Sequence, residues 1–267
     1  MGKSVNIQVA KDHLERLTKA NGTTALMELI WNSLDADAKN IFVNAKAGSL
    51  GITQIIIEDD GNGINYKEAE AVFGTLGGSA KKNKRISPGD RKLHGEEGKG
   101  RLKSLALGSL VKFESIFKDT KSYKFFEITI DANNIQGAEI GDLKSLKNGE
   151  SKTGVKVSIN NINQDCASII LSDKIIHEIE ERLAVYYLSY PDFNISINKK
   201  SLDFERFIQN RFEDAFRVKA ENSDNEVLFK IRILEWSIPT AIPGVNIFEY
   251  PLRALKLMIQ LRPSVYF

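Results

Sequence analysis

The sequence has 267 residues, of which 42% are hydrophobic and 27% charged, which is enough apolar material for one large domain and part of a second. Its 37 basic and 35 acidic side chains leave a net charge of +2, so no global basic field indicates nucleic-acid binding. The single cysteine, Cys166, excludes an internal disulfide framework, and no apolar run reaches the ~20 residues that span a bilayer. The polar first residues lack the apolar core of a signal peptide, so we expect a cytoplasmic protein with no membrane partner.

The first part of the sequence predicts helices and strands up to a glycine-rich stretch. Apolar residues at helical spacing predict a helix from Thr23 to about Asp37, and two strands are expected at 40–47 and 53–61. Another helix is expected at 66–73. The stretch 74–100 then carries seven glycines without apolar periodicity, and loops of this length are typically functional lids or disordered.

Beyond the glycines, strands predominate. The sequence RLKSLALGSL (101–110) predicts a helix that begins at the glycines, and two strands at 110–117 and 122–131 form an expected hairpin. A polar connector leads to a strand at 153–162. The remaining expected elements are a helix at 173–191 that ends at Pro191, a short hairpin at 193–204 and a further hairpin at 216–238.

This pattern predicts two domains. The first spans residues 1–204 and contains the elements up to the short hairpin. Residues 205–267 begin a second α/β domain, and some 60 residues form a small domain on their own. Because the sequence ends on the apolar stretch ALKLMIQLRPSVYF, we expect this second domain to be truncated.

The segments around 59, 95 and 153 carry the chemistry of a nucleotide site. In IIIEDDGNGI, Asp59 ends a buried strand in the pattern D-x-G-x-G, where a carboxylate can accept a hydrogen bond from an exocyclic amine. Bare glycine backbone also lets a flat ring approach closely. The sequence GEEGKG (95–100) stands at the head of a helix, where amide donors and the positive dipole end attract phosphates. Thr153 precedes another strand.

The first helix adds a polar face to this site. At about 100° per residue, Glu28, Asn32 and Asp35 fall within a narrow arc. Such a face is commonly solvated, but the company of Asp59 and Gly95 favours a face that is turned toward a nucleotide. The opposite face of the helix consists of Leu26, Leu29, Ile30 and Ser33.

Four motifs in this order resemble the GHKL ATPase superfamily, which includes gyrase B, the ninety-kilodalton heat-shock chaperone, sensor histidine kinases, MutL and the MORC proteins. Its N-box reads E-x-x-x-N-x-x-D-A. The resemblance covers roughly residues 20–200 and implies an α+β protein with the Bergerat ATP-binding fold. In this two-layer α/β sandwich, helices cover one face of a mixed, mainly antiparallel sheet, and a transducer-like domain follows. The N-box is matched here by Glu28, Asn32, Asp35 and Ala36.

The resemblance implies a role for each matched residue, with ATP and Mg²⁺ as cofactors. Glu28 would be the general base that polarises the attacking water, and Asn32 would hold the Mg²⁺ that is bound with the ATP phosphates. Asp59 would bind the adenine amino group, with Gly63 beside the ring and Thr153 supporting it through water. The other implied nucleotide contacts are Asp35, Gly61, Ile64, Gly95, Gly98, Lys99, Gly100, Arg101 and Lys103, among which Lys103 is favoured over Lys99 as the phosphate ligand.

The glycine-rich stretch resembles an ATP lid. In that interpretation, closure of residues 74–97 over the phosphates couples the nucleotide state to homodimerisation. The sequence GEEGKGRLKSLALG is most similar to the GEKGIGR-type box of bacterial MORC-like ATPases, which favours a prokaryotic DNA-associated or defence-related protein. The stretch 81–101 has a local charge of +5 without interleaved aromatic residues, which indicates a solvated lid more than a single-strand binding surface. DNA contact through the rest of the protein stays an alternative.

Other interpretations of single motifs are weaker. As a calcium loop, the D-x-G-x-G pattern would place Gly61 where an oxygen ligand is required. A P-loop is excluded because Leu93 stands where its first glycine belongs. We expect His94 to be an exposed loop histidine and Trp31 to be a packing residue.

Two alternative functions compete with ATP hydrolysis. A histidine kinase-type phosphotransferase must protect its phosphoryl group from water, and a general base at Glu28 disfavours that function. A nucleotide-gated interaction module that binds ATP without turnover would share all the motifs.

Overall fold

The computed structural model describes residues 19–74, 86–94, 100–120, 122–134, 137–146, 152–219, 226–236 and 244–251. Its contacts divide the chain into two compact units. The first comprises Met1–Ile179 with Asp192–Leu202, and the second comprises Glu180–Pro191 with Asp203–Phe267. The boundary that the sequence predicts after residue 204 stays a prediction, and residues 180–191, which were expected in the first domain, group with the second unit.

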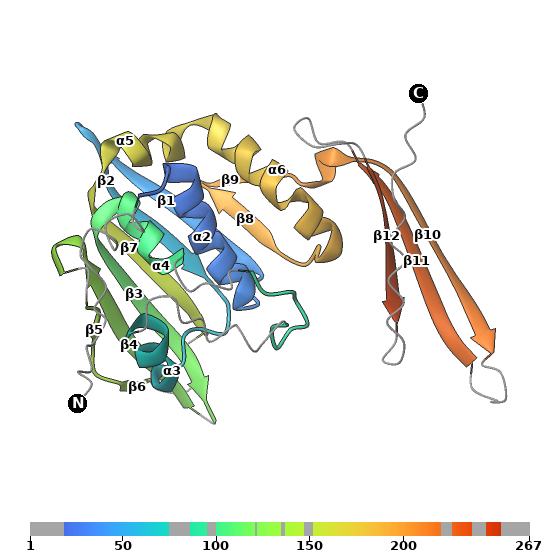
Figure 1. Ribbon diagram of the computed structural model, residues 1–267, viewed down its shortest axis with the longest axis horizontal. Coiled ribbons are helices and arrows are strands. Elements are labelled where there is room, and N and C mark those ends of the chain that lie inside the picture. The colour runs from blue at the N-terminus through green and yellow to red at the C-terminus, as the bar shows by residue number, and fades with distance from the viewer. Residues whose placement is uncertain are drawn as a thin grey trace, which may run out of the picture. The chain divides into compact units, whose positions relative to one another are not determined.

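A single mixed sheet forms the base of the first unit (Figure 1). Its strands are β1 (Asn40–Gly48), β2 (Gly51–Asp59), β3 (Gly108–Asp119), β4 (Ser122–Asp131), β5 (Glu139–Ile140), β6 (Lys144–Leu146), β7 (Gly154–Ile162), β8 (Asn194–Ile197) and β9 (Lys200–Ser201). They follow the order β5-β4-β3-β7-β2-β1-β8-β9, and β6 also pairs with β4. The β1–β8 pair is parallel, whereas the other described pairs of this sheet are antiparallel. The sheet is therefore mixed and mainly antiparallel, as predicted.

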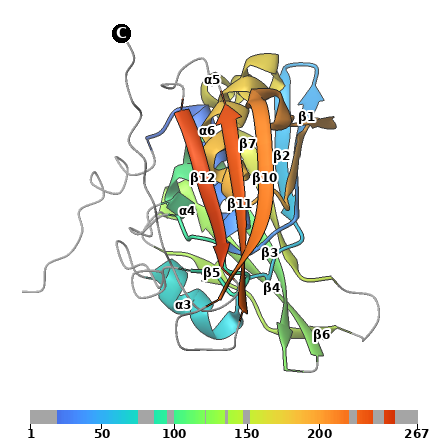
Figure 2. The same ribbon diagram turned by 90° about the vertical axis from the view of Figure 1, so that its right-hand side faces the viewer.

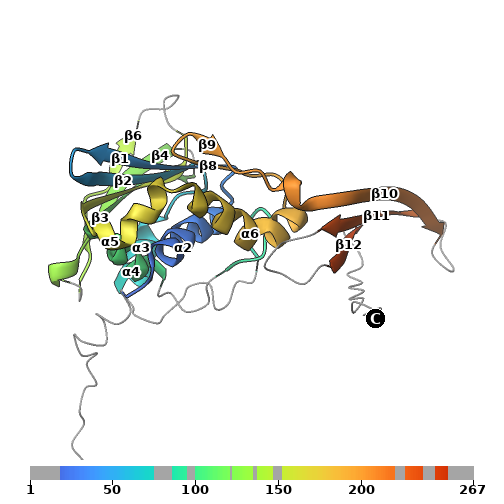
Figure 3. The same cartoon turned by 90° about the horizontal axis from the view of Figure 1, so that it is seen from above.

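Helices cover one face of this sheet (Figure 3). They include α2 (Gly22–Asp35), α3 (Tyr66–Gly74), α4 (Gly100–Lys103), α5 (Gln164–Ala167), the first part of α6 (Asp173–Ser189), and the 3-10 helices η2 (Ser104–Ala106) and η4 (Ser168–Leu171). A further 3-10 helix, η3 (Ala132–Asn134), follows β4. The apolar stripe of α2, including Leu26 and Ile30, is fully buried, as are Ile55 and Ile159 of the sheet. Among the described helices, none is long and apolar enough to cross a membrane. The two layers confirm the predicted fold class.

The start of α2 is fixed by a cap and by a close backbone contact. The side chain of Asn21 accepts a hydrogen bond from the backbone N–H of Thr24 at 2.7 Å, which satisfies one of the open amides of the first turn. A Cβ on Gly22 would lie 1.8 Å from the carbonyl oxygen of Cys166, so α5 packs directly against this turn. The start of α2 is therefore fixed relative to α5.

Two expectations for the first unit are corrected. The helix expected at 101–110 ends at Ala106, because β3 begins at Gly108 and its residue Leu110 already pairs with Asp131 of β4. The connector between β4 and β7 contains the edge strands β5 and β6, which have two and three residues. Strands this short carry too little alternation to be predicted from sequence.

The described strands of the second unit form an antiparallel sheet in the order β10-β11-β12 (Figure 2). They are β10 (Ile208–Lys219), β11 (Glu226–Trp236) and β12 (Gly244–Pro251), preceded by the 3-10 helix η5 (Glu205–Phe207). The hairpin predicted at 216–238 therefore begins earlier, at Ile208, and β12 was not predicted. Within this unit the buried Glu180 of α6 accepts a hydrogen bond from the backbone N–H of Asp203 at 2.7 Å and pairs with Arg206 at 2.7 Å.

Candidate nucleotide site

Three strand ends meet at one edge of the first sheet. The strand β7 lies between β2 and β3 and is antiparallel to both, so the end of β2, the start of β7 and the end of β3 are neighbours. Asp59 is the last residue of β2 and Gly154 is the first residue of β7, where it pairs with Ile116 of β3. We call this edge the base side of the site.

Three hydrogen bonds hold the carboxylate of Asp59. Its Oδ2 accepts from the hydroxyl of Ser33 on α2 at 2.8 Å, and its Oδ1 accepts from the backbone N–H groups of Gly61 and Val155 at 3.0 and 3.2 Å. Burial raises the pKa of Asp59 above its ordinary value, while the hydrogen bonds from Gly61, Ser33 and Val155 act in the opposite direction. An ionised carboxylate has about four acceptor positions. The three described donors leave one of them, on Oδ2, for a further donor.

Crowded backbone fixes the chain around Asp59. Gly63 has φ +73°, and a Cβ there would lie 2.2 Å from the carbonyl oxygen of Ile116. Gly154 has φ +152°, and a Cβ there would lie 2.0 Å from the carbonyl oxygen of Asp59. Both positions therefore require glycine. Thr153, which is half-buried, directly precedes this contact and so belongs to the base side.

Gly61 and Ile64 lie in the same fixed turn. A Cβ on Gly61 would approach the carbonyl oxygen of Ala36 to 2.7 Å, so the turn packs against the end of α2. The backbone N–H of Ile64 donates to the hydroxyl of Ser115 at 2.8 Å, and this fully buried hydroxyl donates back to the carbonyl of Ile64 at 3.1 Å. The structure thus brings together five predicted residues of the base side: Asp59, Gly61, Gly63, Ile64 and Thr153.

Charged side chains form the other half of the site. Glu28 on α2 and Lys103 on α4 form an ion pair, and their side chains are 25% and 31% exposed. Asn32 lies one helical turn beyond Glu28 and is exposed. Gly100 is the first residue of α4. We call this part the phosphate side; of its other predicted members, Gly95, Gly98, Lys99 and the side chain of Arg101 lie outside what the structure describes.

Asp35 holds the chain beside the phosphate side. Its buried carboxylate accepts a hydrogen bond from the backbone N–H of His94 at 2.8 Å. The ring of His94 stacks on Trp31 with centroids 3.7 Å apart and an interplanar angle of 15°. His94 is therefore half-buried against α2, and the expectation of an exposed loop histidine is wrong. The part of Asp35 in nucleotide binding stays a prediction.

Apart from Gly74, which is the last residue of α3, the described portion of the predicted lid is residues 86–94, and hydrogen bonds tie it to the end of α2 and the residues that follow. Asp37 accepts hydrogen bonds from the hydroxyl of Ser87 and from the backbone N–H of Gly89, the latter at 2.9 Å. The guanidinium of Arg91 donates to the carbonyl of Ala38 at 2.7 Å and pairs with Asp192 at 2.9 Å. The side chain of Arg91 is 4% exposed, so this basic residue is not part of a solvated surface. The rest of the predicted lid, residues 75–85 and 95–97, lies outside the described residues.

The sequence did not identify several residues that shape this site. Ser33 was placed with the apolar face of the first helix, yet its hydroxyl bonds to Asp59. The only signal was a hydroxyl within an apolar stripe. Ser115 and Arg91 depend on tertiary contacts with segments distant in sequence, for which no local pattern exists.

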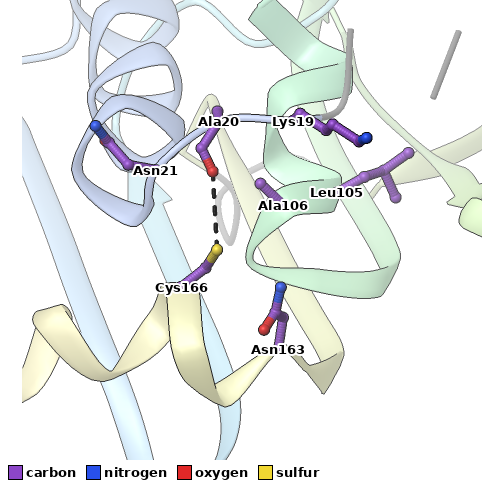
Figure 4. A pocket seen from close by; sticks show the side chains of 7 residues that line it. All are labelled: Lys19, Ala20, Asn21, Leu105, Ala106, Asn163 and Cys166. Atoms are coloured by element: carbon purple, nitrogen blue, oxygen red, sulfur yellow. Dashed lines mark hydrogen bonds between the residues drawn. The ribbon is translucent and has the colours of Figure 1, made fainter. Parts of the chain in front are cut away.

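A separate hollow of about 440 Å³ lies at the start of α2 (Figure 4). Within it the thiol of Cys166 donates to the carbonyl of Ala20 at 3.8 Å. The residues that line it do not overlap with the predicted nucleotide contacts. They are Lys19, Ala20, Asn21, Leu105, Ala106, Asn163 and Cys166.

One helix joins the two sides of the site. Ser33 of α2 contacts Asp59 on the base side, and Glu28 of the same helix contacts Lys103 on the phosphate side. Five residues of helix rise about 7.5 Å, so the two contacts lie at successive levels of one rigid element. The arrangement offers a buried acceptor at one end, and an acid with a cation at the other.

A mainly antiparallel sheet, a helix layer on one face and a buried carboxylate at a strand end under the N-box helix define a GHKL-type ATPase domain. The family described as histidine kinase-, DNA gyrase B-, and HSP90-like ATPase matches residues 20–165, and the chain belongs to this family. Nucleotide binding, typically of ATP with Mg²⁺, and homodimerisation are characteristic of the family.

Two crystal structures of the ATPase region of Saccharomyces cerevisiae topoisomerase II are similar to the chain, one of them bound to ICRF-187 (dexrazoxane). The sequence identities are 17% and 16%, and both superpositions have a TM-score of 0.46. Each covers 80% of this chain, which spans 58% of the length of the solved one. No curated protein matches the chain.

Proposed function

We propose that this chain binds Mg-ATP and hydrolyses it, and that lid closure over the nucleotide drives homodimerisation. The observation that carries the proposal is the acceptor position left on Asp59, placed under the same helix that presents Glu28. A buried carboxylate with one open acceptor position suits an exocyclic amine, and a partly exposed acid on the covering helix suits a water molecule.

The base side would select adenine. The exocyclic amine donates to the open position on Oδ2 of Asp59, and the hydroxyl of Ser33 keeps this oxygen oriented. Gly63 has no side chain that could obstruct a flat ring, and Thr153 supports the contact through water. Because the backbone around these residues is crowded, the base would bind without rearrangement of the turn.

The phosphate side would supply the catalytic groups. Asn32 would hold Mg²⁺ through its amide oxygen, and the metal would supply neutralisation of phosphate charge. Glu28 accepts a proton from the attacking water, while Lys103, and in second place Lys99, binds phosphate oxygen. Asp35, Gly95, Gly98, Gly100 and Arg101 complete the predicted contacts.

The wider role that we propose is the N-terminal module of a larger, prokaryotic MORC-like protein that is DNA-associated or defence-related, with residues 205–267 beginning a transducer-like domain. Support comes from the resemblance of the box GEEGKGRLKSLALG to the MORC-like pattern. DNA would be a partner of the whole protein.

Calorimetry with light scattering tests binding and dimerisation in the same samples. The chain is titrated with ATP and with a non-hydrolysable analogue, with and without Mg²⁺. Mg-dependent binding with a doubling of mass is expected. Binding without a change in mass would contradict the dimerisation step, and no binding of either ligand would contradict the proposal as a whole.

The variant Glu28→Ala tests hydrolysis. We expect turnover to fall by about 10²- to 10⁴-fold, the usual worth of a general base, while the analogue still binds. If turnover is unchanged, Glu28 is not the general base. If the unaltered chain binds nucleotide but shows no turnover, the non-hydrolysing interaction module is favoured.

A further inference from the structure

The ion pair between Glu28 and Lys103 joins two groups to which the proposed reaction gives different partners. Glu28 should accept a proton from water, and Lys103 should bind a phosphate oxygen. In the structure the ammonium of Lys103 is instead placed on the carboxylate of Glu28, across the contact between α2 and α4. The carboxylate of Glu28 and the phosphates of a bound nucleotide would therefore compete for the ammonium of Lys103.

The surroundings of the pair favour exchange between partners. Both side chains are partly exposed, at 25% and 31%, so neither charge is sealed in the core. Lysine is a compact cation on a flexible four-carbon stem, which allows its ammonium to move between neighbouring anions without movement of the helix. A partly exposed ion pair is worth little, so a polyanion that carries several charges can displace it.

The pair also has a chemical consequence. A carboxylate that accepts a charge-assisted hydrogen bond from an ammonium has one fewer acceptor position for water. Glu28 is therefore less available to the attacking water while Lys103 holds it. When the ammonium is withdrawn, the carboxylate regains that acceptor position.

We propose that Lys103 is a positioning residue that holds Glu28 in the nucleotide-free protein and releases it when a phosphate chain takes over the ammonium. This inference rests on the proposed function. Arrival of the polyphosphate and exposure of the base become one event. Adenosine, which fills the base side without phosphates, leaves the pair intact.

A double-mutant cycle in binding tests the exchange. Affinities for a non-hydrolysable ATP analogue with Mg²⁺ are measured by calorimetry for the unaltered chain, Glu28→Gln, Lys103→Met and the double variant. Removal of the Glu28 charge tightens binding through reduced repulsion in either background. If Lys103 must also leave Glu28, the gain is larger where Lys103 is present, by about three- to tenfold, because the free state then loses a competing partner.

The outcomes separate the inference from the proposed function. Equal gains from Glu28→Gln in the two backgrounds would mean that Lys103 stays on Glu28 in the complex, and would overturn the exchange. If the unaltered chain binds neither the analogue nor adenosine, the proposed function is overturned as well. Thermal unfolding of each variant confirms that it is folded.

Two controls exclude a merely structural effect. With adenosine as the ligand, Glu28→Gln should change affinity less than twofold, whereas a structural role would affect both ligands. Lys103→Arg should keep the coupling, since arginine also exchanges between carboxylate and phosphate. The ion pair between Lys112 and Glu127 is similarly exposed, at 37% for each side chain, and its matched cycle with Lys112→Met and Glu127→Gln should show no coupling to the analogue.

Discussion

The two sides of the candidate site are built from different materials. On the base side, backbone amides, buried hydroxyls and glycines hold Asp59, and added side-chain atoms would collide with carbonyl oxygens. On the phosphate side, partly exposed long side chains contact one another, as Glu28 and Lys103 do. Backbone positions are set by the fold, whereas such side chains can change partners at low cost.

The difference teaches how one domain can recognise and also react. A rigid pocket with a buried acceptor recognises its ligand through preorganisation, because few groups lose freedom on binding. A reacting centre needs charges that rearrange when the ligand arrives. The helix α2 serves both needs, since Ser33 and Glu28 lie on one rigid element that links the two sides.

The largest expected effect comes from breaking the rigid side at Gly63. In Gly63→Ala the new Cβ would meet the carbonyl oxygen of Ile116 at 2.2 Å, and φ +73° is unfavourable for alanine. Strain of about 1–2 kcal/mol and overpacking of about 1–3 kcal/mol add to a loss of about 3 kcal/mol in the free energy of unfolding. Urea denaturation measures it.

The matched control is Gly141→Ala. A Cβ at Gly141 would find its nearest neighbour, the carbonyl oxygen of Glu127, at an ordinary 3.6 Å. Its free energy of unfolding should change by less than about 1 kcal/mol. Equal losses in the two variants would show that the base side is no more rigid than an exposed loop.

The variant Asp59→Asn separates recognition from stability on the same side. Loss of the charged acceptor should weaken ATP binding by about 1.5–3 kcal/mol, roughly 10- to 150-fold, as measured by calorimetry. The asparagine oxygen can still accept from Gly61 and Val155, and its amide can donate to Ser33, so the variant should fold. If the affinity for ATP is unaltered in this variant, Asp59 does not bind adenine.

The difference in stability between Asp59→Asn and the unaltered chain should depend on pH in a defined direction. Because burial raises the pKa of Asp59 above 3.8, its neutral form is favoured by folding. The stability that this residue contributes is present below pH 3.8 and is lost as the pH rises through the folded-state pKa. Asparagine does not titrate, so relative to the unaltered chain the variant should gain stability as the pH rises from 3.8 through the folded-state pKa of Asp59. A difference that is constant across this range would contradict the raised pKa.

How much of this comparison could be predicted from sequence differs between the two sides. The pattern D-x-G-x-G placed Asp59 at a strand end, and the N-box spacing placed Glu28 on a helix, because both depend on local periodicity. The hydroxyl of Ser33 could not be assigned to Asp59, since its contact spans 26 residues of sequence. The strands β5 and β6 are too short for any periodic signal.

The lid prediction shows the same limit. Its composition indicated a solvated loop, yet Arg91 is buried between the carbonyl of Ala38, Asp192 and the ring of Phe193, whose centroid lies 5.8 Å from the guanidinium carbon. Composition averages over a segment, whereas burial is decided residue by residue by partners elsewhere in the chain. The burial of a charged residue whose partners are distant in sequence therefore cannot be predicted from the composition of the surrounding segment.

A smaller effect is expected where the phosphate side has a fixed border, at Arg91. In Arg91→Lys, a lysine can reach one partner but not reproduce the planar contacts to Ala38 and Asp192, so stability should fall by about 1–2 kcal/mol in urea denaturation. Asp192 itself is 58% exposed and tolerates the loss. A neutral result would mean that the contacts of residues 86–94 with Asp35 and Asp37 hold this segment without a contribution from Arg91.

The smallest effect concerns an ion pair outside both sides, Lys112 with Glu127, which alternation along β3 and β4 places on the sheet face opposite the helices. The bond to Glu127 raises the pKa of Lys112 above 10.5, so its contribution to stability is present below pH 10.5 and is lost as the pH rises through the folded-state pKa. Since both side chains are 37% exposed, Lys112→Ala should cost less than about 1 kcal/mol at pH 7, and less still in high salt. The pair of Lys112 and Glu127 is the reference for the pair of Glu28 and Lys103. If Lys112→Ala lowers stability more than Lys103→Met does, ion pairs of this exposure stabilise this fold. Lys103 would then exchange between Glu28 and phosphate less readily than we propose.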